Sequence, residues 1–70
     1  MDKNHVIVLV TVMEREGRRL IRSASEIRKI EYFGTDDHSV LDDECSVARE
    51  ASVAASICVR RIKKDAQNSS

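Results

Sequence analysis

The sequence contains no proline and no tryptophan, only two glycines, and only two aromatic residues, Tyr32 and Phe33. Since the glycines stand alone at positions 17 and 34, neither a dinucleotide-binding G-x-G-x-x-G loop nor a P-loop can be present. Net charge is absent as well, whereas most nucleic-acid-binding proteins carry a clear basic excess. Any core must therefore be aliphatic. Enzymes that bind nucleotides or dinucleotides through either of these glycine-rich loops are excluded.

The length of 70 residues predicts one small domain, residues 1–70. A chain this short buries a smaller share of its surface than a large one, so its core is marginal. Small cores of this kind are often completed by a partner subunit or by a target. The length therefore favours a homodimer or a protein that binds another macromolecule.

The strongest local pattern is HVIVLVTVM at residues 5–13, which is almost entirely β-branched or aliphatic and predicts a strand. In a strand, alternate residues share one face, and apolar residues on both faces indicate burial on both. So short a chain cannot cover both faces easily, which favours a strand shared across a homodimer. The predicted core and dimer strand is formed by Val6, Val8, Val10 and Val12.

Two further strands are predicted after a turn at residues 14–17, which ends in glycine. Residues 18–22 would form the returning strand, and residues 27–33 the third, closed by Gly34. An alternative stays open, because Leu20, Ala24 and Ile27 also lie at helical spacing, so that residues 18–32 would form one helix.

Helical signals accumulate from Ser39, with acidic residues early and basic residues late, as the helix macrodipole favours. A heptad-like stripe follows the same segment in steps of four and three: Leu41, Cys45, Ala48, Ser52, Ala55, Val59 and Ile62. The sequence thus predicts an α+β fold, with an N-terminal antiparallel β-meander (β-rich residues 5–33) packed on a C-terminal helix (residues 39–64), followed by a frayed tail (residues 65–70). If a second hairpin forms, the helix begins near Ala51 instead.

Residues 17–31, GRRLIRSASEIRKIE, resemble the small FlbD-like family, which includes a flagellar regulator and uncharacterised phage and bacterial relatives. The matching positions are Gly17, Arg18, Ile27, Ile30 and Glu31. Residues 41–47 are similar to the family's second hairpin, although Glu44 stands where the family usually has glycine, and residues 52–53 are similar to the start of its final helix. The resemblance covers residues 5–33 best, and it implies a small β-rich regulatory or adaptor domain without a known active site.

Residues with catalytic or metal-binding chemistry are few and widely spaced: His5, His38, Cys45 and Cys58. Structural zinc sites pair their ligands within a few residues, and no such pair exists here. The cysteines are 13 residues apart, which on one helix is a rise of about 20 Å, and both are expected to be small buried apolar residues. No nucleophile–base arrangement is recognisable. The sequence therefore predicts no catalytic residue, no cofactor and no metal.

The apolar stretch at residues 6–13 is too short to cross a bilayer and lacks the features of a secretory signal. We therefore expect a cytoplasmic protein without membrane contact, in which both thiols stay reduced.

The main functional prediction concerns a basic cluster that is the expected partner-binding surface: Arg15, Arg18, Arg19, Arg22, Arg28 and Lys29. Arginine-rich faces bind acidic protein surfaces or phosphates. We expect a non-enzymatic regulator that binds a host or cellular protein and modulates or inhibits it, as phage-type anti-activators do. The alternative is a dimeric nucleic-acid-binding transcriptional regulator using the same arginines, although no aromatic residues lie among them to stack on bases.

Overall fold

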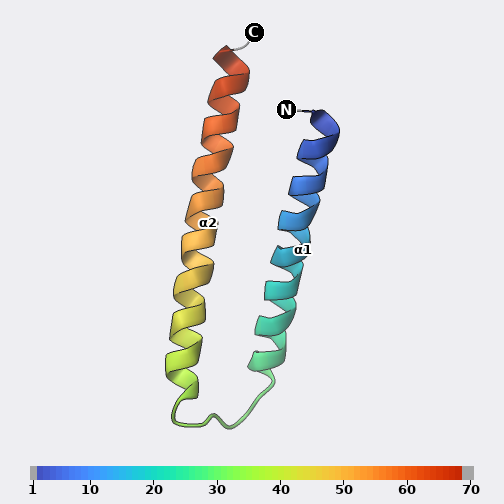
Figure 1. Ribbon diagram of the computed structural model, residues 1–70. Helices are drawn as coiled ribbons and strands as arrows, with labels where there is room; N and C mark the ends of the chain where they lie inside the picture. The colour runs from blue at the N-terminus through green and yellow to red at the C-terminus, as the bar shows by residue number, and fades with distance from the viewer. Residues whose placement is uncertain (1, 69–70) are drawn as a thin grey trace. The chain divides into compact units, whose positions relative to one another are not determined.

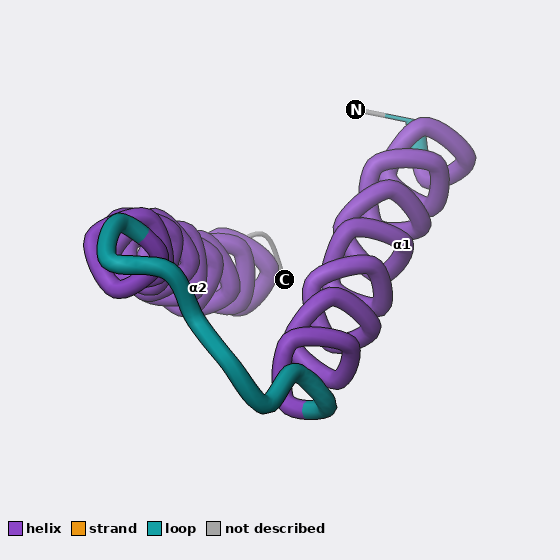
Figure 2. The backbone as a smooth tube through the Cα atoms, turned by 90° about the horizontal axis from the view of Figure 1, so that it is seen from below, coloured by secondary structure: helices purple, strands orange, loops and turns teal. Residues whose placement is uncertain are grey.

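The computed structural model describes residues 2–68, and nearly all of them lie in two helices, α1 (Lys3–Arg28) and α2 (Asp37–Asn68) (Figure 1). Figure 2 shows helix and loop only, and no strand occurs among the described residues. The chain divides into two units, residues 1–32 and 33–70, and each is built around one helix. That the two units act as a single domain stays a prediction.

The predicted α+β fold is wrong, because the whole predicted β-meander over residues 5–33 is replaced by α1 and the residues that follow it. β-Branched residues in a helix cost only up to about 0.7 kcal/mol each relative to alanine. A strand must pair its N–H and C=O groups with a neighbouring strand, whereas a helix pairs them internally. The alternative helix over residues 18–32 was closer, but α1 already begins at Lys3 and ends at Arg28.

The predicted turn at residues 14–17 is also wrong, since all four residues lie inside α1. No glycine among residues 2–68 has a positive φ, so Gly17 does not use the conformation for which a turn would need it. A Cβ atom added at Gly17 would meet nothing within 4 Å. Gly17 is therefore an ordinary, unfavourable helix residue, and no proline interrupts the helix around it.

The first turn of α1 is capped by Asp2, which has extended backbone angles. Its side-chain Oδ1 accepts a hydrogen bond from the backbone N–H of Asn4 at 3.2 Å, and its carbonyl accepts one from Val6 at 3.1 Å. Farther along, the Thr11 hydroxyl donates to the carbonyl of Ile7 at 2.7 Å. The helix that contains the apolar segment thus begins with backbone N–H groups whose hydrogen bonds are made by Asp2.

Replacing Asp2 by alanine is expected to reduce the stability of α1 by about 1 kcal/mol, because the Asn4 N–H loses its acceptor. Circular dichroism at 222 nm during a thermal scan should show a lower midpoint. Asp2→Asn is the matched control, since asparagine caps about as well as aspartate. A midpoint that is equal in the alanine and asparagine variants would show that the cap does not contribute.

α2 begins at Asp37, where the backbone N–H of Gly34 donates to the Asp37 carboxylate at 2.7 Å and the Asp37 N–H donates back to the Gly34 carbonyl at 3.2 Å. The second hairpin at residues 41–47, which was only an alternative, does not form, because these residues are helical. The predicted helix over residues 39–64 lies wholly inside α2. Residues 65–68, expected to fray, extend that helix to Asn68, and residues 69–70 lie outside the described part of the chain.

No residue that the structure describes is buried, so neither unit forms the predicted aliphatic core by itself. The least exposed residues are only half-buried: Ile27, Leu41, Ala48 and Ala55. Isolated helices are marginal in water, and most helix stability in proteins comes from packing an apolar face. Each helix therefore depends on covering its apolar face for further stabilisation.

Candidate functional site

The predicted basic cluster lies on the C-terminal half of α1 and not on a hairpin. A helix turns by about 100° per residue, so residues spaced by three, four and seven share one face. Four arginines follow this spacing, and Lys29, directly after the helix, continues in the same direction. We call this surface the basic face; it consists of Arg15, Arg18, Arg19, Arg22 and Lys29.

Arg28 is the one member of the predicted cluster that lies elsewhere. It is six residues after Arg22, which turns it by more than about 100° from the middle of the basic face. Lys3, at the start of α1, is turned away by a similar angle. The strand prediction missed this separation, because residue spacing has a different meaning in a strand and in a helix.

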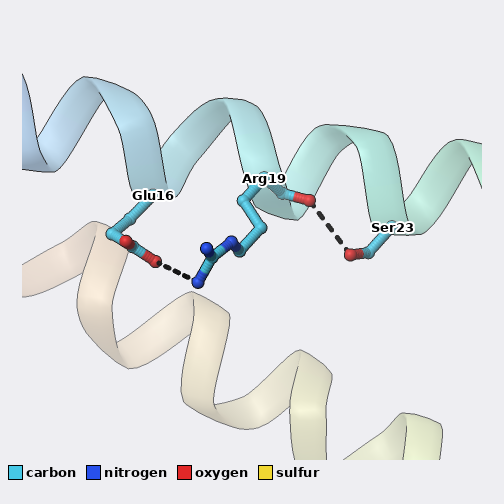
Figure 3. A network of polar contacts seen from close by, with 3 residues as sticks. All are labelled: Glu16, Arg19 and Ser23. Atoms are coloured by element: carbon cyan, nitrogen blue, oxygen red, sulfur yellow. Dashed lines mark hydrogen bonds and ion pairs between the residues drawn. The ribbon is translucent and has the colours of Figure 1, made fainter.

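Two glutamates reduce the charge of the basic face only in part. A terminal nitrogen of Arg19 lies 3.8 Å from an oxygen of Glu16, and the Lys29 ammonium lies 3.9 Å from Glu26. Figure 3 shows the Arg19 side chain reaching back to Glu16 while the Arg19 carbonyl accepts a hydrogen bond from the Ser23 hydroxyl at 3.0 Å. These side chains are all more than half exposed, and such pairs contribute at most about 1 kcal/mol.

The other arginines of the basic face are available to a partner. Among the residues that the structure describes, no carboxylate oxygen lies within 4.0 Å of the guanidinium groups of Arg15, Arg18 or Arg22. Guanidinium groups bind carboxylates and phosphates through paired hydrogen bonds. The basic face can therefore bind an anionic surface, because α1 presents its arginine side chains on one side of the helix.

The predicted dimer strand does not exist as a single face. On a helix, residues two apart point about 200° from one another, so Val6 and Val10 share one face while Val8 and Val12 lie on the opposite one. All four side chains are exposed, between 40% and 58%. The strand interface predicted from them is wrong, because alternation has no single face on a helix.

A different stripe runs along α1, and the sequence analysis identified only its part at Leu20, Ala24 and Ile27. Its members recur in alternating steps of four and three, on the side of the helix opposite the basic face: Val6, Val10, Met13, Gly17, Leu20, Ala24 and Ile27. This heptad spacing was the signal that could have predicted α1 in full. It was overlooked because Gly17 was taken to end a turn and divided the pattern.

α2 carries the stripe that the sequence predicted, from Leu41 to Ile62, and we call it the α2 stripe. The two cysteines differ from the prediction. Cys45, in the stripe, and Cys58, directly before Val59 of the stripe, are both free and exposed rather than buried. Over residues 2–68, no three His, Cys, Asp or Glu side chains are grouped closely enough to hold a metal ion.

Comparisons with family models, with curated proteins and with solved structures find no match for this chain. The resemblance of residues 17–31 to the FlbD-like family therefore stays a prediction, and the strands that it implied are absent from the described residues. Within those same residues, no helix has the uninterrupted apolar length that a bilayer crossing requires.

Proposed function

We propose that this chain is a non-enzymatic regulatory protein that binds an acidic surface of a cellular protein through the basic face of α1 and modulates that protein's activity. The observation that carries the proposal is the set of arginines at helical spacing, of which Arg15, Arg18 and Arg22 have no carboxylate within 4.0 Å among the described residues. Complementary charge steers such encounters and selects among partners.

The helical setting of these arginines supports a protein ligand. Opposite the basic face lies the apolar stripe of α1, so the helix is amphipathic, with a charged and an apolar side. Amphipathic helices commonly bind other proteins by placing one face into a groove or against another helix. A regulator of this kind needs no catalytic group, because its effect follows from occupying a surface.

Nucleic acid is the second ligand class that the same face suits, since guanidinium groups also bind phosphates. The zero net charge of the chain and its two aromatic residues favour the protein ligand. The two classes differ in their response to salt, because phosphate contacts make affinity fall steeply with ionic strength.

The test is a pull-down from cell lysate with the purified chain, carried out with and without nuclease and read by mass spectrometry. We expect Arg18→Glu combined with Arg22→Glu to weaken capture of the partner by at least about tenfold, because two attractive contacts become repulsive. The matched control is Lys3→Glu combined with Arg28→Glu, which changes the net charge equally but lies off the basic face.

The control double variant should retain the partner at the wild-type level, and circular dichroism should show equal helix content in all three proteins. Equal capture by both double variants would remove the basic face from the proposal. Loss of all enrichment on nuclease treatment would instead assign the basic face to nucleic acid.

A further inference from the structure

We infer that α2 binds antiparallel to the α2 of a second copy of this chain, through the α2 stripe. This inference concerns another helix than the proposed function does and does not depend on it. The stripe consists of Leu41, Cys45, Ala48, Ser52, Ala55, Val59 and Ile62. It extends over about 32 Å of helix, at about 1.5 Å per residue.

The charges of α2 indicate that a second copy binds the stripe and that the two helices run in opposite directions. At the N-terminal end of α2, residues 37–44 include four carboxylates and no lysine or arginine. Residues 60–64 contain four cations and no anion. A parallel pair in register would place carboxylates beside carboxylates and cations beside cations, which is unfavourable. An antiparallel pair places each acidic end beside a basic end. The acidic end comprises Asp37, Asp42, Asp43 and Glu44, and the basic end Arg60, Arg61, Lys63 and Lys64.

The apolar and charged patterns have the same centre. The α2 stripe is centred near Ser52, and the acidic and basic ends lie at similar distances on either side of it. A two-fold axis at this point would bring residues 42–44 of one copy to the level of residues 60–62 of the other, and the reverse by symmetry, so that each acidic end lies along a basic end. The residues nearest the axis are small, which lets the two backbones approach closely.

Large apolar side chains of the α2 stripe are left uncovered by α2 itself. On the stripe itself, Val59 and Ile62 are 47% and 59% exposed, so large apolar side chains remain to be covered.

The two native cysteines report the direction of pairing. Around an axis at Ser52, Cys45 of one copy lies opposite Val59 of the other and therefore one residue from the level of its Cys58, whereas in a parallel pair each Cys45 lies beside the Cys45 of its partner. Both thiols are free and exposed. The probe is a short bismaleimide, which is applied to the chain after its thiols have been reduced and the reductant has been removed; the products are then separated by mass.

We expect covalent dimers from the wild-type chain and from an equimolar mixture of Cys45→Ser and Cys58→Ser chains, but not from either variant alone. A Cys45→Ser/Cys58→Ser chain that carries Glu50→Cys places its only thiol on the opposite side of α2 and measures random collision. Sedimentation equilibrium without cross-linker should give twice the mass of the chain.

Two results would overturn the inference. Cross-linking of the Cys58→Ser variant alone, as fast as in the mixture, would establish a parallel pair. A monomeric wild-type chain at about 100 µM, with its helix content retained, would show that something other than a second copy covers the α2 stripe. Circular dichroism of each serine variant tests that the substitution leaves the helices intact.

Discussion

Replacing Gly17 by proline is expected to interrupt α1 and to reduce the stability of the helix by about 3 kcal/mol or more. Gly17 lies near the middle of the helix, with fourteen residues of α1 before it and eleven after it. Proline there removes one backbone hydrogen bond, and its ring collides with the preceding turn. The two shorter helices that remain are marginal in water. The circular dichroism signal at 222 nm should therefore fall by more than the contribution of one helical residue.

Gly17→Ala is the matched control, and it should act in the opposite direction. A Cβ at this position meets nothing within 4 Å and the backbone has no positive φ, so alanine should stabilise α1 by about 1 kcal/mol. A glycine at the end of a hairpin turn would give the reverse result, because alanine is strained at positive φ. Destabilisation by Gly17→Ala would therefore contradict the helix.

Reversing the charges at one end of α2 is expected to weaken the proposed antiparallel pair by at least about tenfold. In the first variant, Asp42, Asp43 and Glu44 are replaced by lysine, so that both ends of α2 are basic. In the second, Arg60, Arg61, Lys63 and Lys64 are replaced by glutamate, so that both ends are acidic. Each exposed pair contributes up to about 1 kcal/mol, and several pairs become repulsive at once. Sedimentation equilibrium gives the dissociation constants.

Mixing the two variants provides the control. Both also oppose the helix macrodipole, which lowers helix stability in either chain alone. Only the mixture brings basic ends beside acidic ends again. It should therefore dimerise at the same protein concentration as the wild-type chain. If the mixture is as weakly associated as each variant, the charges act on helix stability and not on pairing between chains.

The absence of buried residues links stability to binding in this protein. With every described side chain at least partly exposed, neither helix is stabilised by a core within its own unit. Anything that covers an apolar face and binds only the helical form will stabilise that form in proportion to its concentration. Helix content and association should therefore be measured at the same protein concentration in each experiment above.

The sequence by itself determined the C-terminal helix, the α2 stripe and the separation of acidic and basic ends. These features depend on spacing along one helix, and α2 obeys it from Asp37 to Asn68. The basic cluster was also recognised, because arginines close in sequence are close in either secondary structure. Its division into a basic face and a separate Arg28 could not be predicted while the segment was taken for a strand.

Only the tertiary structure decided the state of residues 5–33. Strand preference depends on neighbouring strands and burial, and the described residues offer neither to HVIVLVTVM. Without them, internal hydrogen bonding and the Asp2 cap favour a helix. The same reason explains Cys45 and Cys58, which were expected to be buried and are exposed. Burial requires a second surface, and one helix alone does not provide it.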